Sequence, residues 1–261
     1  VPGFLPDLPE VRREIAEDTT SVKRCDEVVG AILRALEESG AAGNTLVMFL
    51  SDHGMALPFA KTNCYYHSTR TPWMVRWPGV VKPNTTDGEH MISTIDFLPT
   101  ILEALELPPL EGIDGRSFLP LLRGEQQTGR DRVFTRFDRT SGGNNYEMRA
   151  VLTPQRLFIF NAWANGKTVF RNESQSGRTF KAMVAGAEDD EALAARVALF
   201  QYRTPRELFD YTNDPDALVN LAADPAHAAE AAALSRELLE HLRSVEDPLA
   251  PTFARALEAG E

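Results

Sequence analysis

A short apolar run followed directly by polar residues is the feature that most constrains how this chain can fold. Residues 45–50 are Thr-Leu-Val-Met-Phe-Leu, a run rich in strand formers and preceded by turn residues. Such a run is typical of a strand that helices cover on both faces. Residues 51–54, Ser-Asp-His-Gly, follow at the carboxyl end of this expected strand. Open α/β sheets bind their ligands at that edge, so the sequence predicts an α/β fold with a ligand site there.

The neighbouring patterns extend this expectation. Apolar residues recur at helical spacing from Glu10 to Glu38, and residues 72–77 indicate a second buried strand. Further along, Asp96 is placed to cap a helix that has Pro99 in its first turn, where proline is tolerated. The order helix, strand, loop, strand, helix favours a mostly parallel sheet flanked by helices.

The pattern changes after about Arg130, where short strand-like pieces alternate with turn residues. These pieces are residues 133–136, 146–153, 156–161, 168–170 and 207–211. An amphipathic helix is expected from about Pro225 to Val245. We therefore predict two domains: an α/β core over residues 1–130, and a smaller subdomain over residues 131–261, made of an antiparallel sheet and a packed helix.

Composition excludes several classes of protein. The net charge of −11 argues against a nucleic-acid partner, which normally meets a basic face. No apolar run approaches the roughly 20 residues of a membrane span. The two cysteines, Cys25 and Cys64, lack Cys-x-x-Cys spacing and are expected to be small buried hydrophobes. The first residues lack both Met and a signal-peptide pattern, which leads us to expect a portion of a longer protein.

Residues 51–70 contain the side chains that can carry chemistry. Asp52 offers carboxylate oxygen and His53 imidazole nitrogen, and both suit a divalent cation. Lys61 and Arg70 can pair with an anionic group, and His67 can transfer a proton near neutral pH. A metal and a lysine facing one oxyanion would stabilise charge on a transferred group.

Each of these residues also has an ordinary explanation. Asp52 could simply cap a turn, with His53 beside it on the surface. Arg70 suits a structural ion pair as well as it suits an anion-binding role. The residue types alone therefore predict a metal or anion site and nothing narrower.

Several stretches resemble the sulfatase family of the alkaline-phosphatase superfamily. Residues 46–65 resemble its C-terminal metal motif, with Ser-Asp-His-Gly, a Pro-Phe pair and a lysine before Thr-Asn. This stretch is most similar to the heparan N-sulfatase (sulfamidase)-like branch. The other stretches resemble the helix before the metal strand, the Asp-x-x-Pro-Thr helix start with its Asp-Gly-Arg-Ser continuation, and the Glu-Leu-Phe-Asp-Tyr signature of the C-terminal subdomain. They lie at residues 26–33, 93–102, 114–122 and 205–221.

The resemblance implies a function and roles for these side chains. The implied reaction is hydrolysis of sulfate esters or sulfamates, with a sulfated small molecule or saccharide as substrate. By position Asp52 and His53 are ligands of one divalent metal, with Ca²⁺ expected first. His53 occupies a position where many sulfatases have Asn and related phosphonate and phosphate monoesterases have His, which admits Mn²⁺ or Zn²⁺. Lys61 matches the catalytic cation that contacts the transferring group, while His67 and Arg70 are substrate-pocket candidates without a family counterpart.

The resemblance also implies parts outside this chain. Sulfatases use a formylglycine, made from the first residue of Cys/Ser-x-Pro-x-Arg, as nucleophile, and neither cysteine lies in that motif. We expect the nucleophile and the remaining metal ligands in an N-terminal half of the same protein, which makes that half a partner and residues 1–261 alone inactive. The alternatives are a phosphate or phosphonate monoester hydrolase and a non-catalytic binding or scaffold half. Family habit implies the periplasm or the cell exterior.

Overall fold

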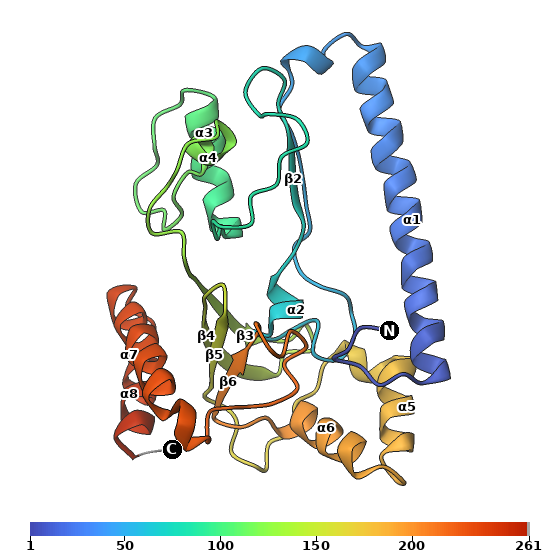
Figure 1. Ribbon diagram of the computed structural model, residues 1–261, viewed down its shortest axis with the longest axis vertical. Coiled ribbons are helices and arrows are strands. Elements are labelled where there is room, and N and C mark those ends of the chain that lie inside the picture. Colours follow the sequence, from blue (N-terminus) through green and yellow to red (C-terminus); the bar gives the residue numbers. More distant parts are fainter. Residues whose placement is uncertain (260–261) are drawn as a thin grey trace. The chain divides into compact units, whose positions relative to one another are not determined.

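The computed structural model describes residues 1–259 and divides into two compact units (Figure 1). Unit 1 comprises Val1–Thr19, His53–Arg70 and Phe134–Glu261, and unit 2 comprises Thr20–Asp52 and Thr71–Val133. The later boundary lies near the predicted one at residue 130. The units are defined by contacts rather than by independent folding, so the division into domains 1–130 and 131–261 stays a prediction.

Unit 2 is built around a pair of short strands. The strands are β1 (Val47–Leu50) and β2 (Trp73–Arg76), and they pair antiparallel, with Val47 opposite Arg76 and Leu50 opposite Trp73. The expectation of a parallel arrangement is wrong for this pair. A parallel pair needs a crossover that returns the chain to the opposite end of the sheet. Here the link leaves β1 and enters β2 at the same end, where the Ser51 amide donates to the Pro72 carbonyl.

The helices of unit 2 are mostly short. The helix α1 (Pro9–Glu38) begins in unit 1 and continues into unit 2, followed by a 3₁₀ turn at Ala42–Asn44. The others are a 3₁₀ turn at Thr94–Asp96, α3 (Phe97–Ala104) and α4 (Leu119–Leu122). All four side chains of β1 are partly exposed rather than buried, because the strand pair has no third strand within the described part of the chain.

Asp96 anchors the loops around α3. Its carboxylate accepts hydrogen bonds from the backbone N–H groups of Ser93 at 2.9 Å and Arg116 at 2.8 Å. It also accepts a hydrogen bond from Arg130 Nη1 at 2.5 Å. It was expected to cap α3, but it makes no side-chain cap bond to that helix. It closes a capping box with Ser93 one turn earlier and ties in two later loops. A Cβ at Gly115 would clash with the backbone just before Asp96, so only glycine permits this approach.

Unit 1 contains the antiparallel sheet predicted for the C-terminal part. Its strand order is β3-β4-β5-β6, and β4 with β5 and β5 with β6 are antiparallel neighbours. The strands are β3 (Val133–Arg139), β4 (Asn145–Leu152), β5 (Arg156–Asn161) and β6 (Arg206–Asp210). Residues 153–155 form the turn that joins β4 to β5, and the Thr153 amide donates to the Arg156 carbonyl across it.

Unit 1 also contains several helices around this sheet. They are α2 (Tyr66–Thr69), α5 (Arg178–Gly186), α6 (Glu191–Tyr202), α7 (Ala228–Ser244) and α8 (Ala250–Ala259), with 3₁₀ turns at Glu173–Ser176 and Pro225–His227. The strand predicted at residues 168–170 is wrong. The Asn165 carboxamide accepts the amides of Lys167 and Thr168 and curls this segment into a turn instead.

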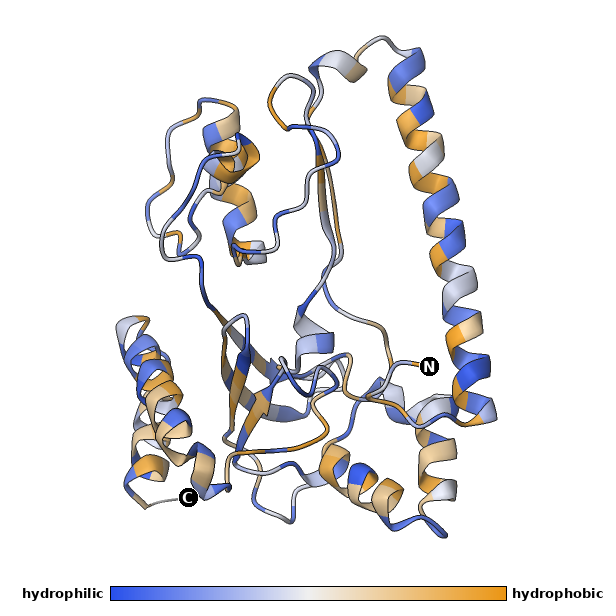
Figure 2. Ribbon diagram, viewed as in Figure 1, coloured by the Kyte–Doolittle hydropathy of each residue, from blue (hydrophilic) through white to orange (hydrophobic). Residues whose placement is uncertain are grey.

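The hydrophobic core of unit 1 lies between the sheet and the last two helices (Figures 1 and 2). The helix α7 contributes four leucines, three of which are spaced at i, i+4 and i+8, as the predicted amphipathic pattern requires. Phe160 of β5 stacks on Phe253 of α8, with ring centroids 4.4 Å apart. The buried members are Val151, Phe158, Phe160, Leu208, Leu234, Leu238, Leu239, Leu242, Ala250 and Phe253.

The cysteines differ from each other. Cys64 is buried as expected, and burial raises the pKa of its thiol to about 12. Cys25 is exposed, so the expectation that it is buried is wrong. The reason is that α1 buries only Val11 among its thirty described residues. None of the helices over residues 1–259 combines the length and apolar composition that a bilayer-spanning segment needs.

Candidate functional site

The predicted metal ligands lie at the end of β1. Asp52 and His53 are both exposed, and His53 Nδ1 lies 2.8 Å from the Gly54 carbonyl oxygen. Asp52 closes a segment of unit 2 and His53 opens a segment of unit 1. Over residues 1–259, no group of three or more His, Cys, Asp and Glu side chains is arranged to hold a metal ion. The chemistry of the two donors suits a divalent cation, but Ca²⁺ takes six or more oxygen ligands, so Asp52 and His53 would supply only part of the donor set that it needs.

Gly54 closes the loop that follows. Its amide donates to the Ser68 carbonyl at 3.2 Å. A Cβ at this position would lie against the carbonyl oxygens of Ala60 and His67. Glycine at this position permits close backbone contact across the loop.

Residues 57–65, which we call the Lys61 loop, are packed into unit 1. Phe59 and Tyr65 are 1% and 3% exposed. Phe59 and Thr62 adopt positive φ angles of 65° and 59°, which non-glycine residues rarely adopt. Asn63 Oδ1 accepts a hydrogen bond from the Tyr65 backbone N–H at 2.8 Å, and Asn63 Nδ2 donates one to the Lys61 carbonyl at 2.7 Å. The backbone around Lys61 is therefore held in one conformation.

The Lys61 side chain meets a carboxylate from a distant part of the sequence. Its Nζ forms an ion pair with Glu173 Oε1. The neighbouring residues pair as well, since Asn172 Nδ2 donates to the Thr62 hydroxyl at 2.5 Å. Sequence reasoning did not assign Asn172 and Glu173 to the site, because they lie 110 residues or more along the chain. The one pattern they match, the Asn-x-Ser glycosylation triplet of residues 172–174, does not indicate catalysis.

His67 lies on α2 and is half-buried in different surroundings. Its ring stacks on Phe4 with centroids 4.3 Å apart, and its Nε2 donates to the Pro215 carbonyl at 3.1 Å. Burial lowers the pKa of His67, and the nearby Asp216 carboxylate opposes that shift. The imidazole therefore favours its neutral form near pH 7 more strongly than a solvent-exposed histidine does.

Arg70, the third candidate on this loop, is exposed, and its guanidinium lies 5.2 Å from the centre of the Tyr66 ring. The Tyr66 amide donates to the Tyr211 hydroxyl at 3.0 Å, which fixes the start of α2. Different segments of unit 1 thus hold the Lys61 and His67 side chains. The Lys61 region contacts residues 172–173, and His67 contacts residues 4 and 215–216. The structure brings Lys61 together with Glu173, a residue that was not predicted for the site.

A buried arginine supports the Lys61 loop. The Arg203 guanidinium, 5% exposed, lies 4.6 Å from the centre of the Tyr65 ring and 5.2 Å from that of Phe59. Cation–π attraction of this kind strengthens when the cation is shielded from water. The fully buried Glu207 carboxylate accepts a hydrogen bond from Asn161 Nδ2 at 3.1 Å. Burial raises the pKa of Glu207, and the charge of Arg203 opposes that shift. Sequence reasoning missed this cluster too.

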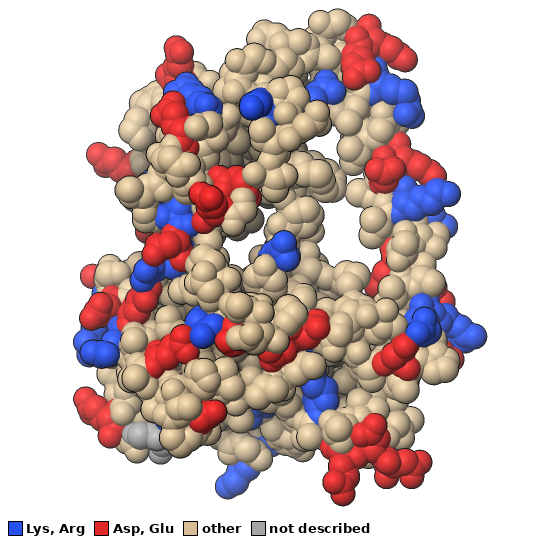
Figure 3. Space-filling model, in the orientation of Figure 1, with Lys and Arg blue, Asp and Glu red and all other residues tan. Residues whose placement is uncertain are grey.

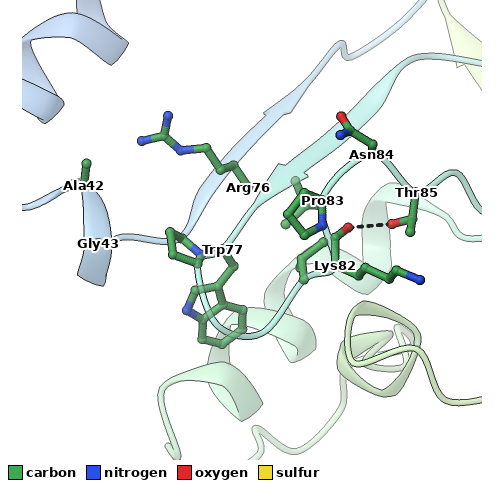
Figure 4. Close-up of a pocket in the computed structure, with 11 residues that line it drawn as sticks. Ala42, Gly43, Arg76, Trp77, Lys82, Pro83, Asn84 and Thr85 are labelled. Atoms are coloured by element: carbon green, nitrogen blue, oxygen red, sulfur yellow. Dashed lines mark hydrogen bonds between the residues drawn. The ribbon is translucent and has the colours of Figure 1, made fainter.

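Unit 2 has a pocket of about 590 Å³, lined by Ala42, Gly43, Val75, Arg76, Trp77, Pro78, Val81, Lys82, Pro83, Asn84 and Thr85 (Figure 4). It lies at the far end of the strand pair from Asp52, because Arg76 pairs with Val47 at the start of β1. The Arg76 and Lys82 side chains point in opposite directions and do not converge on a common point (Figure 4). Asp52 is therefore not part of this pocket.

Charged side chains of both signs lie on the surface of the protein (Figure 3). On the face shown in Figure 3, acidic and basic side chains are interspersed and no broad basic patch is present.

Known proteins similar to this chain include sulfatases. The family model described as Sulfatase matches residues 3–107. Human N-sulphoglucosamine sulphohydrolase is 30% identical over 254 residues, which cover 93% of this chain and 49% of that protein. The chain therefore spans about half the length of the curated relatives it matches, with shares of 49% and 41% for the first two.

Solved structures share the fold. A 2-O GAG sulfatase matches with a TM-score of 0.67 at 22% identity, over 90% of this chain and 44% of that one. The phosphonate monoester hydrolase of Silicibacter pomeroyi matches with a TM-score of 0.59 at 23% identity, over 84% of this chain and 38% of that one. The family model therefore identifies a sulfatase domain at residues 3–107, and the similarity to the human sulphohydrolase extends over 93% of this chain.

Proposed function

We propose that the protein containing this chain hydrolyses sulfate esters or sulfamates of a saccharide or another sulfated small molecule, in a metal-dependent reaction. The observation that carries this proposal is the rigid Lys61 loop, which follows Asp52 and His53 at the end of β1 in a chain whose residues 3–107 match the Sulfatase family model. The names of two matched proteins, a glucosamine sulphohydrolase and a GAG sulfatase, support a saccharide as the substrate class.

Each side chain has a proposed role. Asp52 and His53 hold one divalent cation, with Ca²⁺ as the first choice and Mn²⁺ or Zn²⁺ favoured by the imidazole nitrogen. When bound, such a cation supplies Lewis-acid stabilisation of the transferring group. Lys61 directs its ammonium at the developing oxyanion and stabilises its charge. His67 and Arg70 are proposed to line the substrate pocket.

The proposed partner is an N-terminal half of the same protein, carrying the formylglycine nucleophile and the remaining metal ligands. Unit 2 supports this with large apolar side chains that are exposed on α1, β2 and α3 and suit a protein interface. They are Val22, Val28, Ile32, Met74, Phe97 and Leu98. On its own, the chain is proposed to be inactive. Family resemblance also leads us to propose the periplasm or the cell exterior as its compartment.

The metal role can be tested with Asp52→Ala in the whole protein that contains this chain. We expect kcat/KM for 4-nitrophenyl sulfate to fall at least about 100-fold, since several kcal/mol of charge stabilisation would be lost. Asp189→Ala removes an exposed carboxylate from a turn and serves as the matched control, with unchanged activity. Activity of Asp52→Ala within threefold of the unsubstituted protein would contradict the assignment, as would aryl sulfate hydrolysis by residues 1–261 alone with added Ca²⁺ or Mn²⁺.

The second candidate function is hydrolysis of phosphate or phosphonate monoesters. It is favoured by His53 and is compatible with the fold shared with a phosphonate monoester hydrolase. Comparing kcat/KM for 4-nitrophenyl sulfate and for a 4-nitrophenyl phosphonate on the same preparation decides between the two. A non-catalytic scaffold would show metal binding that is identical with and without Asp52→Ala.

A further inference from the structure

The ion pair between Lys61 and Glu173 occupies the ammonium that the proposed chemistry needs. The two side chains are 22% and 39% exposed, so the lysine is the better covered partner and the carboxylate keeps much of its hydration. An oxyanion that reaches Lys61 therefore meets an ammonium that already has a negatively charged partner. The identity of that oxyanion rests on the function proposed above, but the contact between the two side chains does not.

The segment that carries Glu173 is built to hold its position. Asn172 and Gln175 form a capping box around the 3₁₀ turn, with the Asn172 amide 3.3 Å from Gln175 Oε1. Ser174 Oγ donates to Asn172 Oδ1 at 2.8 Å, and Gln175 Nε2 donates to the Phe170 carbonyl at 2.9 Å. Glu173 thus extends from a turn whose backbone and side chains are fixed independently of Lys61.

The Lys61 loop is also held in place by its own backbone and by Arg203. Its positive φ angles at Phe59 and Thr62 and the Arg203 guanidinium beneath Tyr65 leave the backbone little freedom. The bond from Asn172 to the Thr62 hydroxyl joins the loop to the turn beside the ion pair. Any change of partner at Lys61 is therefore made by the side chain alone, which rotates away from a carboxylate that stays in place.

From this geometry we propose that Glu173 is a positioning residue for Lys61: it holds the ammonium when no oxyanion is bound and gives it up to the oxyanion of the substrate. Partly exposed ion pairs contribute little net stability, so releasing Lys61 to the substrate anion costs little. The released carboxylate stays solvated and repels the departing sulfate product. Glu173 therefore both orients Lys61 before the reaction and competes with sulfate for it.

The contact can be tested on this chain by measuring how fast acetic anhydride modifies Lys61, using peptide mass spectrometry. Acylation needs a free neutral amine, so Glu173→Gln should raise the rate at Lys61 about two- to fivefold, as loss of a partly exposed ion pair implies. Lys167 in its exposed turn is the internal standard, and Glu188→Gln is the matched control in which Lys61 keeps its rate. Glu173→Asp, which keeps the charge on a shorter side chain, should give an intermediate rate and serves as a second variant should Glu173→Gln fold poorly. Equal Lys61 rates in the unsubstituted chain and in both Glu173 variants would overturn the proposal.

The exchange of partners is tested by the same labelling on the whole protein, with inorganic sulfate as the probe and chloride at matched ionic strength as the control. Sulfate should protect Lys61, and Glu173→Gln should lower the half-protecting sulfate concentration about two- to fivefold because the competing carboxylate is gone. An unchanged concentration, or no protection by either sulfate or phosphate, would overturn the exchange. Protection by phosphate but not by sulfate would leave the role of Glu173 intact and contradict the sulfatase proposal instead.

Discussion

At the scale of single residues, His67 is the clearest case of surroundings that set chemistry. Its ring lies between Phe4 and the Pro215 carbonyl, where burial lowers the pKa of the imidazole despite the Asp216 carboxylate 3.6 Å away. The folded protein consequently binds the His67 proton less readily than the unfolded chain does. Stability linked to His67 is fully present above the unfolded pKa of about 6.5, and it is lost as the pH falls from there towards the folded pKa.

His67→Gln removes this titration and should flatten the acid side of the stability profile. Urea unfolding between pH 7.5 and pH 5 should show a smaller loss of unfolding free energy in the variant than in the unsubstituted chain. Asp216→Asn, which keeps the ring buried but removes the carboxylate that favours the imidazolium, should steepen the loss over the same range. Parallel profiles for the unsubstituted chain and His67→Gln would show that burial of this ring does not shift its titration.

At the scale of elements, α5 depends on a residue from α1. The N-cap of α5 is Gly177, which offers no side chain to the first amides of the helix. The Glu14 carboxylate takes that place, accepting the amides of Arg178 at 3.2 Å and Thr179 at 2.6 Å. A negative charge at a helix N-terminus also interacts favourably with the helix dipole.

Glu14→Gln keeps the size of the side chain but removes its charge and one acceptor oxygen. We expect it to lower the unfolding free energy by about 1 kcal/mol, the usual cost of losing a charged cap. The control is Glu38→Gln at the exposed C-terminal end of the same helix, with an expected change within about 0.5 kcal/mol. The two midpoints in urea at pH 7 measure the difference, and equal midpoints would mean that Glu14 does not cap α5.

On the scale of the whole molecule, unit 1 is held together by contacts between segments far apart in sequence. Arg149 on β4 is 3% exposed and bonds to Asp138 of β3 at 2.6 Å and to Asp247 between α7 and α8 at 2.7 Å. It thereby joins the sheet to the helical pair that covers it. Removing one partner of a buried pair leaves an uncompensated charge, which costs more than the pair itself contributes.

Asp247→Ala should therefore lower the unfolding free energy of this chain by about 3 kcal/mol. The matched control is Asp131→Ala, which breaks an exposed Asp–Arg pair at 2.7 Å and should cost less than about 1 kcal/mol. Urea titrations followed by far-UV circular dichroism measure both changes. Comparable losses in the two variants would mean that the buried network does not contribute as its burial implies.

The sequence by itself determined the elements in which apolar side chains recur with a regular local spacing. The helix from residue 10 to 38, the strand before Asp52 and the amphipathic α7 all follow from the hydrophobic spacing along the chain. The motif Ser-Asp-His-Gly was found in the same way, since a strand end and its following loop are contiguous in the chain.

Only the tertiary structure decided which distant groups meet. The antiparallel direction of β2, the exposure of Cys25, the pairing of Lys61 with Glu173 and the burial of Arg203 under the Lys61 loop have no local signature. Each depends on partners brought together by the packing of whole elements. The local sequence around a residue determines its preference for helix, strand or turn. The charged group that its side chain contacts in the folded protein is set by long-range packing.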